Sequence, residues 1–134
     1  MVPITSYTNV AGVPVSQKIA ASRLEEIVQR TRDGGAEVVK LLKAGSAYYA
    51  PAAAVAEMVD SIVFDQKRVL PCAAYCDGEY GIEGLFVGVP VKLGKDGVEE
   101  IVEIELSDAE REDLHRSAGA VRELVDAMAS PQKS

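Results

Sequence analysis

Residue types that usually perform acid–base catalysis are scarce in this sequence, which has a single histidine among 134 residues. His115 follows Leu114 in a stretch with helical periodicity, and Arg111 and Glu112 flank it at helical distance. A catalytic histidine normally meets a carboxylate inside a cleft. Nothing in this spacing indicates a cleft, so we interpret His115 as an exposed helix residue.

The two cysteines, Cys72 and Cys76, lie four positions apart in a stretch that predicts a β-strand. On an extended strand this spacing separates the two residues by about 13 Å, which is too far for a disulfide. A structural zinc site needs four ligands, and the sequence has no second cysteine pair and no histidine pair. We therefore predict no metal site and two buried, unreactive thiols in a reducing compartment, the cytoplasm.

Charge and missing motifs exclude several classes of function. The net charge of −7 and the pI of about 4.7 disfavour binding to nucleic acid or to an anionic membrane surface. No apolar run reaches the ~20 residues that span a bilayer, and residues 1–10 lack the pattern of a signal peptide. No G-x-G-x-x-G follows a predicted strand and no phosphate loop is present, so a nucleotide-binding domain is not predicted.

The segment 43–51 is unusual, because it combines small residues with two adjacent tyrosines between two predicted helices. Small residues let a ligand or another backbone come close, and tyrosine offers an apolar ring with a polar tip. The same composition also fits a short connection between helices whose tyrosines lie in the core. The residues alone leave both interpretations open.

Apolar periodicity predicts four helices. The first begins at Ser22, which forms a capping-box pattern with Glu25, and it is expected to stop at Gly34-Gly35. The others are expected over 36–43, from Pro51 to about residue 64, and from the second capping-box pattern, Ser107 and Glu110, to about residue 129.

The strand-forming residues lie in two regions. The first 20 residues have extended character, and three strands are predicted over 68–75, 85–93 and 98–106, with a hairpin loop at 94–97. Together these elements predict one domain over 1–134. Its fold class is α/β, of the α+β type, with a twisted antiparallel sheet that helices cover on one side.

Several short motifs, in a fixed order, resemble the C-terminal half of bacterial malate dehydrogenases of the lactate-dehydrogenase-like type. The resemblance extends over essentially the whole chain, and the order and spacing of the motifs make it specific. They are Met1-Val2-Pro3, Val10-Ala11-Gly12-Val13-Pro14, Thr31-Arg32-Asp33-Gly34-Gly35, Gly45-Ser46-Ala47-Tyr48-Tyr49-Ala50-Pro51, Val69-Leu70-Pro71-Cys72, Gly78-Glu79-Tyr80-Gly81 and Gly88-Val89-Pro90-Val91.

This resemblance implies a domain that binds substrate and contacts other subunits in an NAD-dependent enzyme of the tricarboxylic acid cycle. In the family, the catalytic histidine lies directly before the segment that Met1-Val2-Pro3 matches, and the nucleotide-binding domain lies further upstream. We therefore expect no catalytic residue in this chain, no tight NAD binding and no activity of the chain alone. His115 matches no catalytic position.

The family pattern also implies which residues line the pocket. Ser46 and Ala47 match substrate-facing positions, and the small Ala47 stands where lactate dehydrogenases carry threonine, which leaves room for malate or oxaloacetate. Met1 and Pro51 match positions beside the nicotinamide ring of NAD. A homo-oligomer is also implied, without nucleic acid or membrane partners.

Three alternatives remain open at this stage. In the first, the chain is an oligomerisation or assembly module, in which the helices from Ser22 and from Pro51 make the contacts. In the second, it is the same domain of a lactate or other 2-hydroxy acid dehydrogenase, which Ala47 disfavours. In the third, it is one of two separate chains that reassociate.

Overall fold

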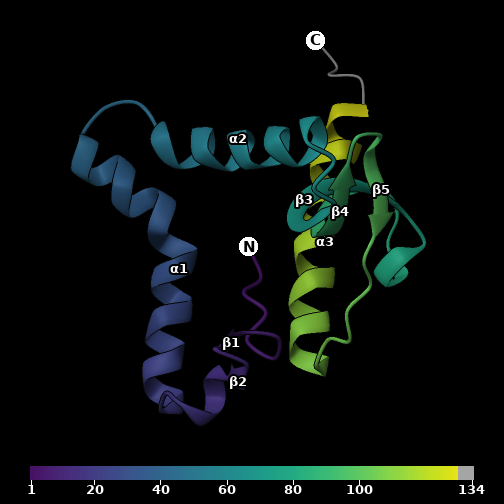
Figure 1. Cartoon of the computed structure of the whole chain (residues 1–134). Coiled ribbons are helices and arrows are strands. Elements are labelled where there is room, and N and C mark those ends of the chain that lie inside the picture. Colours follow the sequence, from purple (N-terminus) through teal and green to yellow (C-terminus); the bar gives the residue numbers. More distant parts are fainter. Residues whose placement is uncertain (130–134) are drawn as a thin grey trace. The chain divides into compact units, whose positions relative to one another are not determined.

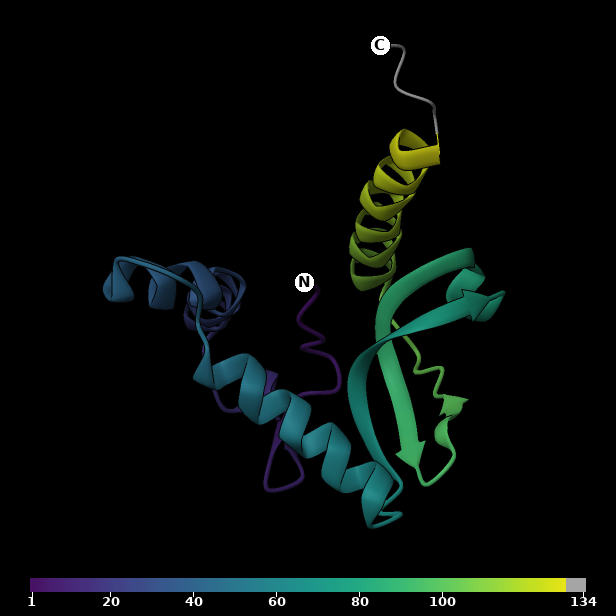
Figure 2. The ribbon, with the colours of Figure 1, turned by 90° about the horizontal axis from the view of Figure 1, so that it is seen from above.

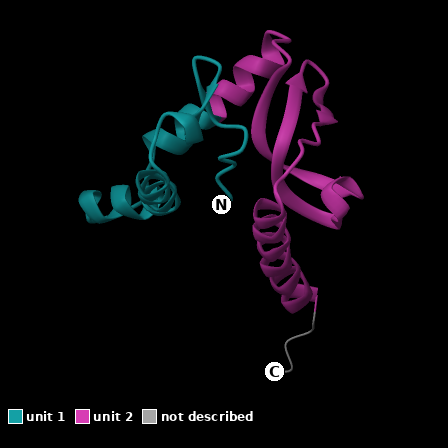
Figure 3. Cartoon of the chain, turned by 90° about the horizontal axis from the view of Figure 1, so that it is seen from below, with its two compact units in different colours: residues 1–54 teal, residues 55–134 magenta. Residues whose placement is uncertain are grey.

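The computed structural model describes residues 1–129, and these residues fall into two compact units, 1–54 and 55–134 (Figure 3). The elements are shown along the chain in Figure 1. In order they are β1 (Asn9–Val10), β2 (Val13–Pro14), the 3-10 helix η1 (Val15–Gln17), α1 (Ala21–Leu42), α2 (Tyr49–Val63), β3 (Arg68–Asp77), the 3-10 helix η2 (Glu79–Gly81), β4 (Glu83–Gly94), β5 (Gly97–Ile101) and α3 (Asp108–Ala129).

The extended start of the chain is confirmed as a small antiparallel hairpin. β1 and β2 pair through Val10 and Val13, and the turn between them uses Ala11 (φ 52°) and Gly12 (φ 78°). A two-residue turn with two positive φ angles matches the right-handed twist of its strands, and glycine adopts that angle without strain. The hairpin then leads through η1 into the first long helix.

The prediction that Gly34-Gly35 ends the first helix is wrong, because α1 continues through both glycines for 22 residues. Glycine permits a left-handed end but does not require one, and a glycine inside a helix costs only about 0.5–1 kcal/mol. Arg30 contacts Glu37 across this point, through Nη2 and Nε at 3.0 and 3.2 Å. The helix ends instead at Lys43, whose left-handed φ of 64° forms the C-cap.

The predicted capping box at the start of α1 does not form. The N-cap is Ala20, and it makes no side-chain cap hydrogen bond. Ser22 therefore lies within the first turn rather than at its boundary, where its hydroxyl cannot take the N-cap role. α2 begins at Tyr49, two residues before the predicted start, so Pro51 lies in its first turn but not at its first position.

Unit 55–134 contains the predicted antiparallel sheet in the order β3-β4-β5 (Figure 2). All three strands are confirmed, and the Gly94–Gly97 pair closes the predicted hairpin. Along β4, buried side chains alternate with more exposed ones, so one face of the sheet is packed. The buried residues of β3 and β4 are Ala74, Cys76, Leu85, Val87, Val89, Val91 and Leu93.

The third strand is shorter than predicted, because β5 ends at Ile101 rather than Leu106. The phenol of Tyr80 replaces the missing strand contacts. Its hydroxyl donates to the Val102 carbonyl at 2.7 Å and accepts from the Ile104 amide at 2.9 Å. A side chain contributed by η2 therefore ends the strand, and no pattern within 98–106 could show this.

A buried serine connects α2 to the sheet. Ser61 has no exposed surface, and its hydroxyl donates to the Leu93 carbonyl at 2.8 Å and accepts from the Arg68 amide at 3.2 Å. Arg68 and Leu93 are directly paired in the β3–β4 ladder. The hydroxyl thus satisfies one backbone group from each strand, as a buried polar group must.

The second capping box is confirmed at the start of α3. The Glu110 amide donates to Ser107 Oγ at 3.3 Å, and the Ser107 amide donates to the Glu110 carboxylate at 3.0 Å. Leu114 and Ala118 bury the same helix face, which contacts β4. Leu124 and Met128 continue the predicted apolar stripe but remain exposed.

These two serines give a direct test of the helix starts. Ser107→Ala should lower the free energy of unfolding by about 0.5–2 kcal/mol, because it removes a formed cap. Ser22→Ala is the matched control and should change it little, because this serine caps nothing. Urea unfolding followed by circular dichroism measures both, and equal losses would contradict the assignment.

Candidate functional site

The loop between α1 and α2 contains three residues in left-handed backbone conformations. These are Lys43 (φ 64°), Gly45 (φ 80°) and Tyr48 (φ 29°). The conformation suits glycine, but at a bulky residue it costs about 1–3 kcal/mol unless surrounding contacts hold it. Such strain concentrates where a backbone must present particular groups, which makes this loop the first candidate for a binding site.

Hydrogen bonds within the loop hold Ser46 and Ala47 against the start of α2. The Tyr48 amide donates to Ser46 Oγ at 3.4 Å. The Ala47 carbonyl accepts from the Ala50 amide at 3.2 Å, and the Tyr48 carbonyl accepts from the Ala52 amide at 3.1 Å. The Ser46 side chain and the Ala47 backbone therefore each have a hydrogen-bond partner close to the start of α2.

The four predicted site residues differ in exposure and position. Ala47 is half-buried, whereas Ser46 and Pro51 are exposed in the same loop and first helical turn. Met1 is 79% exposed and precedes β1. The chain thus groups Ser46, Ala47 and Pro51 within six consecutive positions, while Met1 belongs to a separate segment of the same unit.

The interpretation of the two tyrosines as core residues is wrong. Tyr49 is 89% exposed and Tyr48 is 59% exposed. Tyr48 is the more covered of the two because its ring lies over Gly45. A Cβ atom at position 45 would lie 2.5 Å from Tyr48 Cζ and would overlap the hydroxyl. The sequence signal for this contact is a glycine three residues before a tyrosine, and sequence reasoning missed it.

The two cysteines and the histidine lie outside the loop between α1 and α2, and their surroundings do not make them reactive. Cys76 is buried as predicted, whereas Cys72 is only half-buried; both are free, and burial raises the pKa of each thiol. Because the thiolate is the reactive form, this supports the prediction of unreactive thiols. His115 is exposed on α3, as predicted, beside a shallow hollow that Gly81 and Arg122 also line.

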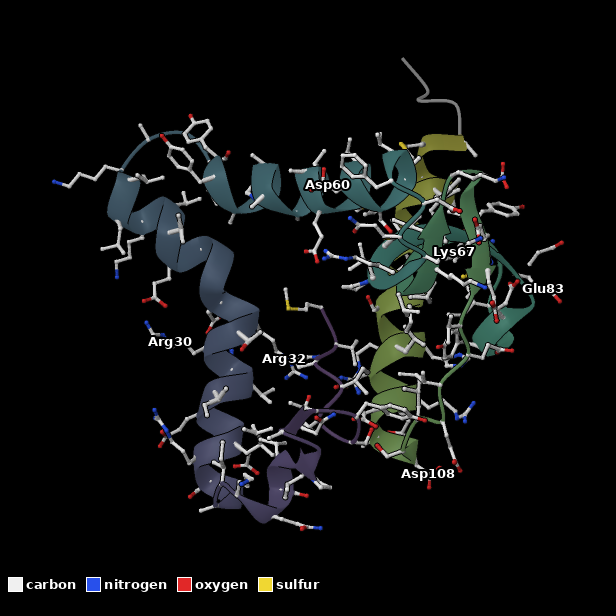
Figure 4. All side chains as sticks on the ribbon, viewed as in Figure 1. Arg30, Arg32, Asp60, Lys67, Glu83 and Asp108 are labelled. Carbon is white, nitrogen blue, oxygen red and sulfur yellow. The ribbon has the colours of Figure 1, made fainter. Side chains whose placement is uncertain are left out.

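A charged cluster joins the end of α2 to the β4–β5 hairpin. Lys67 Nζ lies 3.1 Å from Glu99 and 3.7 Å from Asp65 (Lys67 is labelled in Figure 4). Its hydrogen bond with Glu99 raises the pKa of Lys67. The Lys95 amide donates to Asp65 and lowers the pKa of that carboxyl. These groups are mutually paired, so the cluster fixes the hairpin rather than offering a reactive group.

Two features are absent from residues 1–129. Among them, no group of three or more histidine, cysteine or carboxylate residues is placed to hold a metal ion. No helix in this described range is both long enough and apolar enough to cross a membrane.

Comparison with known proteins decides the family. Residues 1–130 match the lactate/malate dehydrogenase α/β C-terminal domain. This chain belongs to that family. A malate dehydrogenase of Rhodopirellula baltica is 60% identical over 128 residues, which cover 96% of this chain and 41% of the relative. The predicted family and fold class are therefore confirmed.

Solved structures of this family share the fold closely. The malate dehydrogenase of Salinibacter ruber is 54% identical with a TM-score of 0.91, over 96% of this chain and 42% of that one. A lactate dehydrogenase of Cryptosporidium parvum, solved with lactic acid and NAD, is 39% identical with a TM-score of 0.91. The match covers 96% of this chain and 42% of the lactate dehydrogenase. The chain thus spans about two-fifths of the relatives it matches.

Proposed function

We propose that this chain is the substrate-side domain of an NAD-dependent malate dehydrogenase, which interconverts malate and oxaloacetate. The observation that carries the proposal is the 60% identity to a malate dehydrogenase across 96% of the chain. The loop 43–51, with its ordered Ser46 and Ala47, supplies the binding surface. NAD is the proposed cofactor, since the related lactate dehydrogenase was solved with it.

Ala47 is the proposed determinant of substrate size. Its methyl group is half-buried and its backbone is fixed at the start of α2. Replacing a larger residue with alanine widens a pocket by the volume of the missing atoms, which favours a four-carbon dicarboxylate over lactate. Ser46 is proposed to hydrogen-bond the substrate, and Pro51 and Met1 to pack beside the nicotinamide.

The chemistry requires groups that we propose lie outside this domain. Hydride transfer from an alcohol carbon needs a base for the hydroxyl proton and an oriented nicotinamide. The single histidine of this chain, His115, lies on α3 and not in the loop. We propose that the base, the carboxylate-binding arginine and the nucleotide-binding domain belong to the part of the relatives that this chain does not match.

A chimeric enzyme tests the role of Ala47. This chain would replace the matching 42% of the Salinibacter ruber malate dehydrogenase, and oxaloacetate reduction by NADH would be measured. Ala47→Thr should lower kcat/KM for oxaloacetate by about 10–200-fold, which corresponds to ~1–3 kcal/mol for added bulk in a fitted pocket. The exposed Ala44, in the same loop, provides the matched control Ala44→Thr. Equal effects of the two substitutions, or none from Ala47→Thr, would contradict the proposal.

The chain alone should neither bind nor turn over these ligands. Calorimetric titration with NAD and oxaloacetate, separately and together, should give no saturable heat, because the base and the nucleotide-binding groups are missing. A saturable isotherm, or turnover above a mock purification, would show that this domain forms a working pocket without them.

A second proposed role is assembly, which the exposure of α1 supports. None of its 22 residues is buried, although Leu41 and Leu42 are apolar and 75% and 50% exposed. A helix gains most of its stability from packing an apolar face, so α1 is expected to contact another subunit in a homo-oligomer.

Light scattering at high micromolar concentration tests this assembly role. The chain should have at least twice its monomer mass, and Leu41→Lys should return it to the monomer by placing a charge in the contact. Leu124→Lys on α3 is the control, since Leu124 is 68% exposed and lies outside α1. A monomer before any substitution would refute the assembly role.

A further inference from the structure

Tyr48 has both a strained backbone and a specific side-chain contact. Its φ of 29° lies in the left-handed region, and its ring occupies the space that a Cβ atom at position 45 would need. A tyrosine in this conformation persists only when other contacts hold it. The contact with Gly45 is such a restraint, because it fixes the ring against the backbone three residues earlier.

We infer that Tyr48 is a positioning residue whose ring closes over Gly45 and fixes the conformation of Ser46 and Ala47. Those two residues lie between the glycine and the tyrosine, so the closed ring sets the length and direction of the segment that contains them. The Tyr48 amide bonds to Ser46 Oγ, and the Tyr48 carbonyl bonds to the Ala52 amide of α2. The inference rests on the proposed function, in which this segment faces the substrate.

Two separable features favour glycine at position 45. One is its φ of 80°, which any other residue adopts with strain, and the second is the ring of Tyr48. Gly12 has nearly the same φ, 78°, but no atom within 4 Å of a Cβ built there. Gly12→Ala therefore measures the backbone cost alone, and Gly45→Ala measures that cost together with the displaced ring.

The first experiment uses the chain itself and follows amide hydrogen exchange at Ala50 and Ala52. Their amides bond to the Ala47 and Tyr48 carbonyls and so report the loop conformation. Tyr48→Ala should speed exchange at both amides at least tenfold, whereas Tyr48→Phe, which keeps the ring, should change it less than threefold. Tyr49→Ala is the matched control, because Tyr49 is 89% exposed. Equal effects of Tyr48→Ala and Tyr49→Ala would overturn the inference.

A double-mutant cycle then isolates the contact between the ring and the glycine. Gly45→Ala should destabilise the chain more than Gly12→Ala does. In the Tyr48→Ala background its effect should fall to that of Gly12→Ala, because the ring no longer occupies the space. An undiminished effect in that background would show that the φ of Gly45 alone matters, and would overturn the inference.

The kinetic experiment uses the chimeric malate dehydrogenase and separates positioning from overall structure. Tyr48→Ala should raise KM for oxaloacetate at least tenfold, with KM for NADH changed less than twofold and with activity retained by Tyr48→Phe. Faster amide exchange without a change in KM would overturn the positioning role and leave the proposed function intact. An inactive parent chimera would instead refute the proposed function, while the exchange data would still decide whether Tyr48 holds the loop.

Discussion

One buried hydroxyl, that of Ser61, fixes the C-terminal half of α2 to the sheet, and the packing of helix on sheet in unit 55–134 depends on it. Ser61 Oγ contacts one backbone group of Arg68 and one of Leu93, the first paired residues of the β3–β4 ladder. An apolar residue there would leave the buried Leu93 carbonyl and the part-buried Arg68 amide without this partner. The serine therefore connects the C-terminal end of α2 to the first paired residues of β3 and β4.

The sequence predicted the sheet well because its signals are local. Strand-forming residues over 68–75 and 85–93 predicted β3 and β4, and the segment 94–97 predicted the hairpin. The end of β5 could not be predicted in the same way. It depends on Tyr80, a residue about twenty positions earlier whose hydroxyl bonds to Val102 and Ile104.

Helix boundaries show why a motif alone is not decisive. Ser22 and Ser107 stand in the same capping-box pattern, yet only Ser107 forms it. Ala20, two residues before Ser22, has the N-cap position, so the helix starts earlier than the motif indicates. At the site, resemblance identified Ser46, Ala47, Met1 and Pro51. The contact of Tyr48 with Gly45 was missed, because the spacing of a glycine and a tyrosine does not by itself show the backbone angle that brings them together.

The way in which Tyr80 ends β5 has a consequence for the backbone groups that the sheet leaves open. The edge of a sheet is a template for further strands, and proteins block it by shortening strands or occupying backbone groups. Tyr80 occupies the Val102 carbonyl and the Ile104 amide, beyond the last residue of β5. At the opposite edge, Pro71 removes a donor from β3. Pro71 therefore leaves β3 without one backbone donor, and the chain beyond Ile101 has two of its backbone groups already bonded.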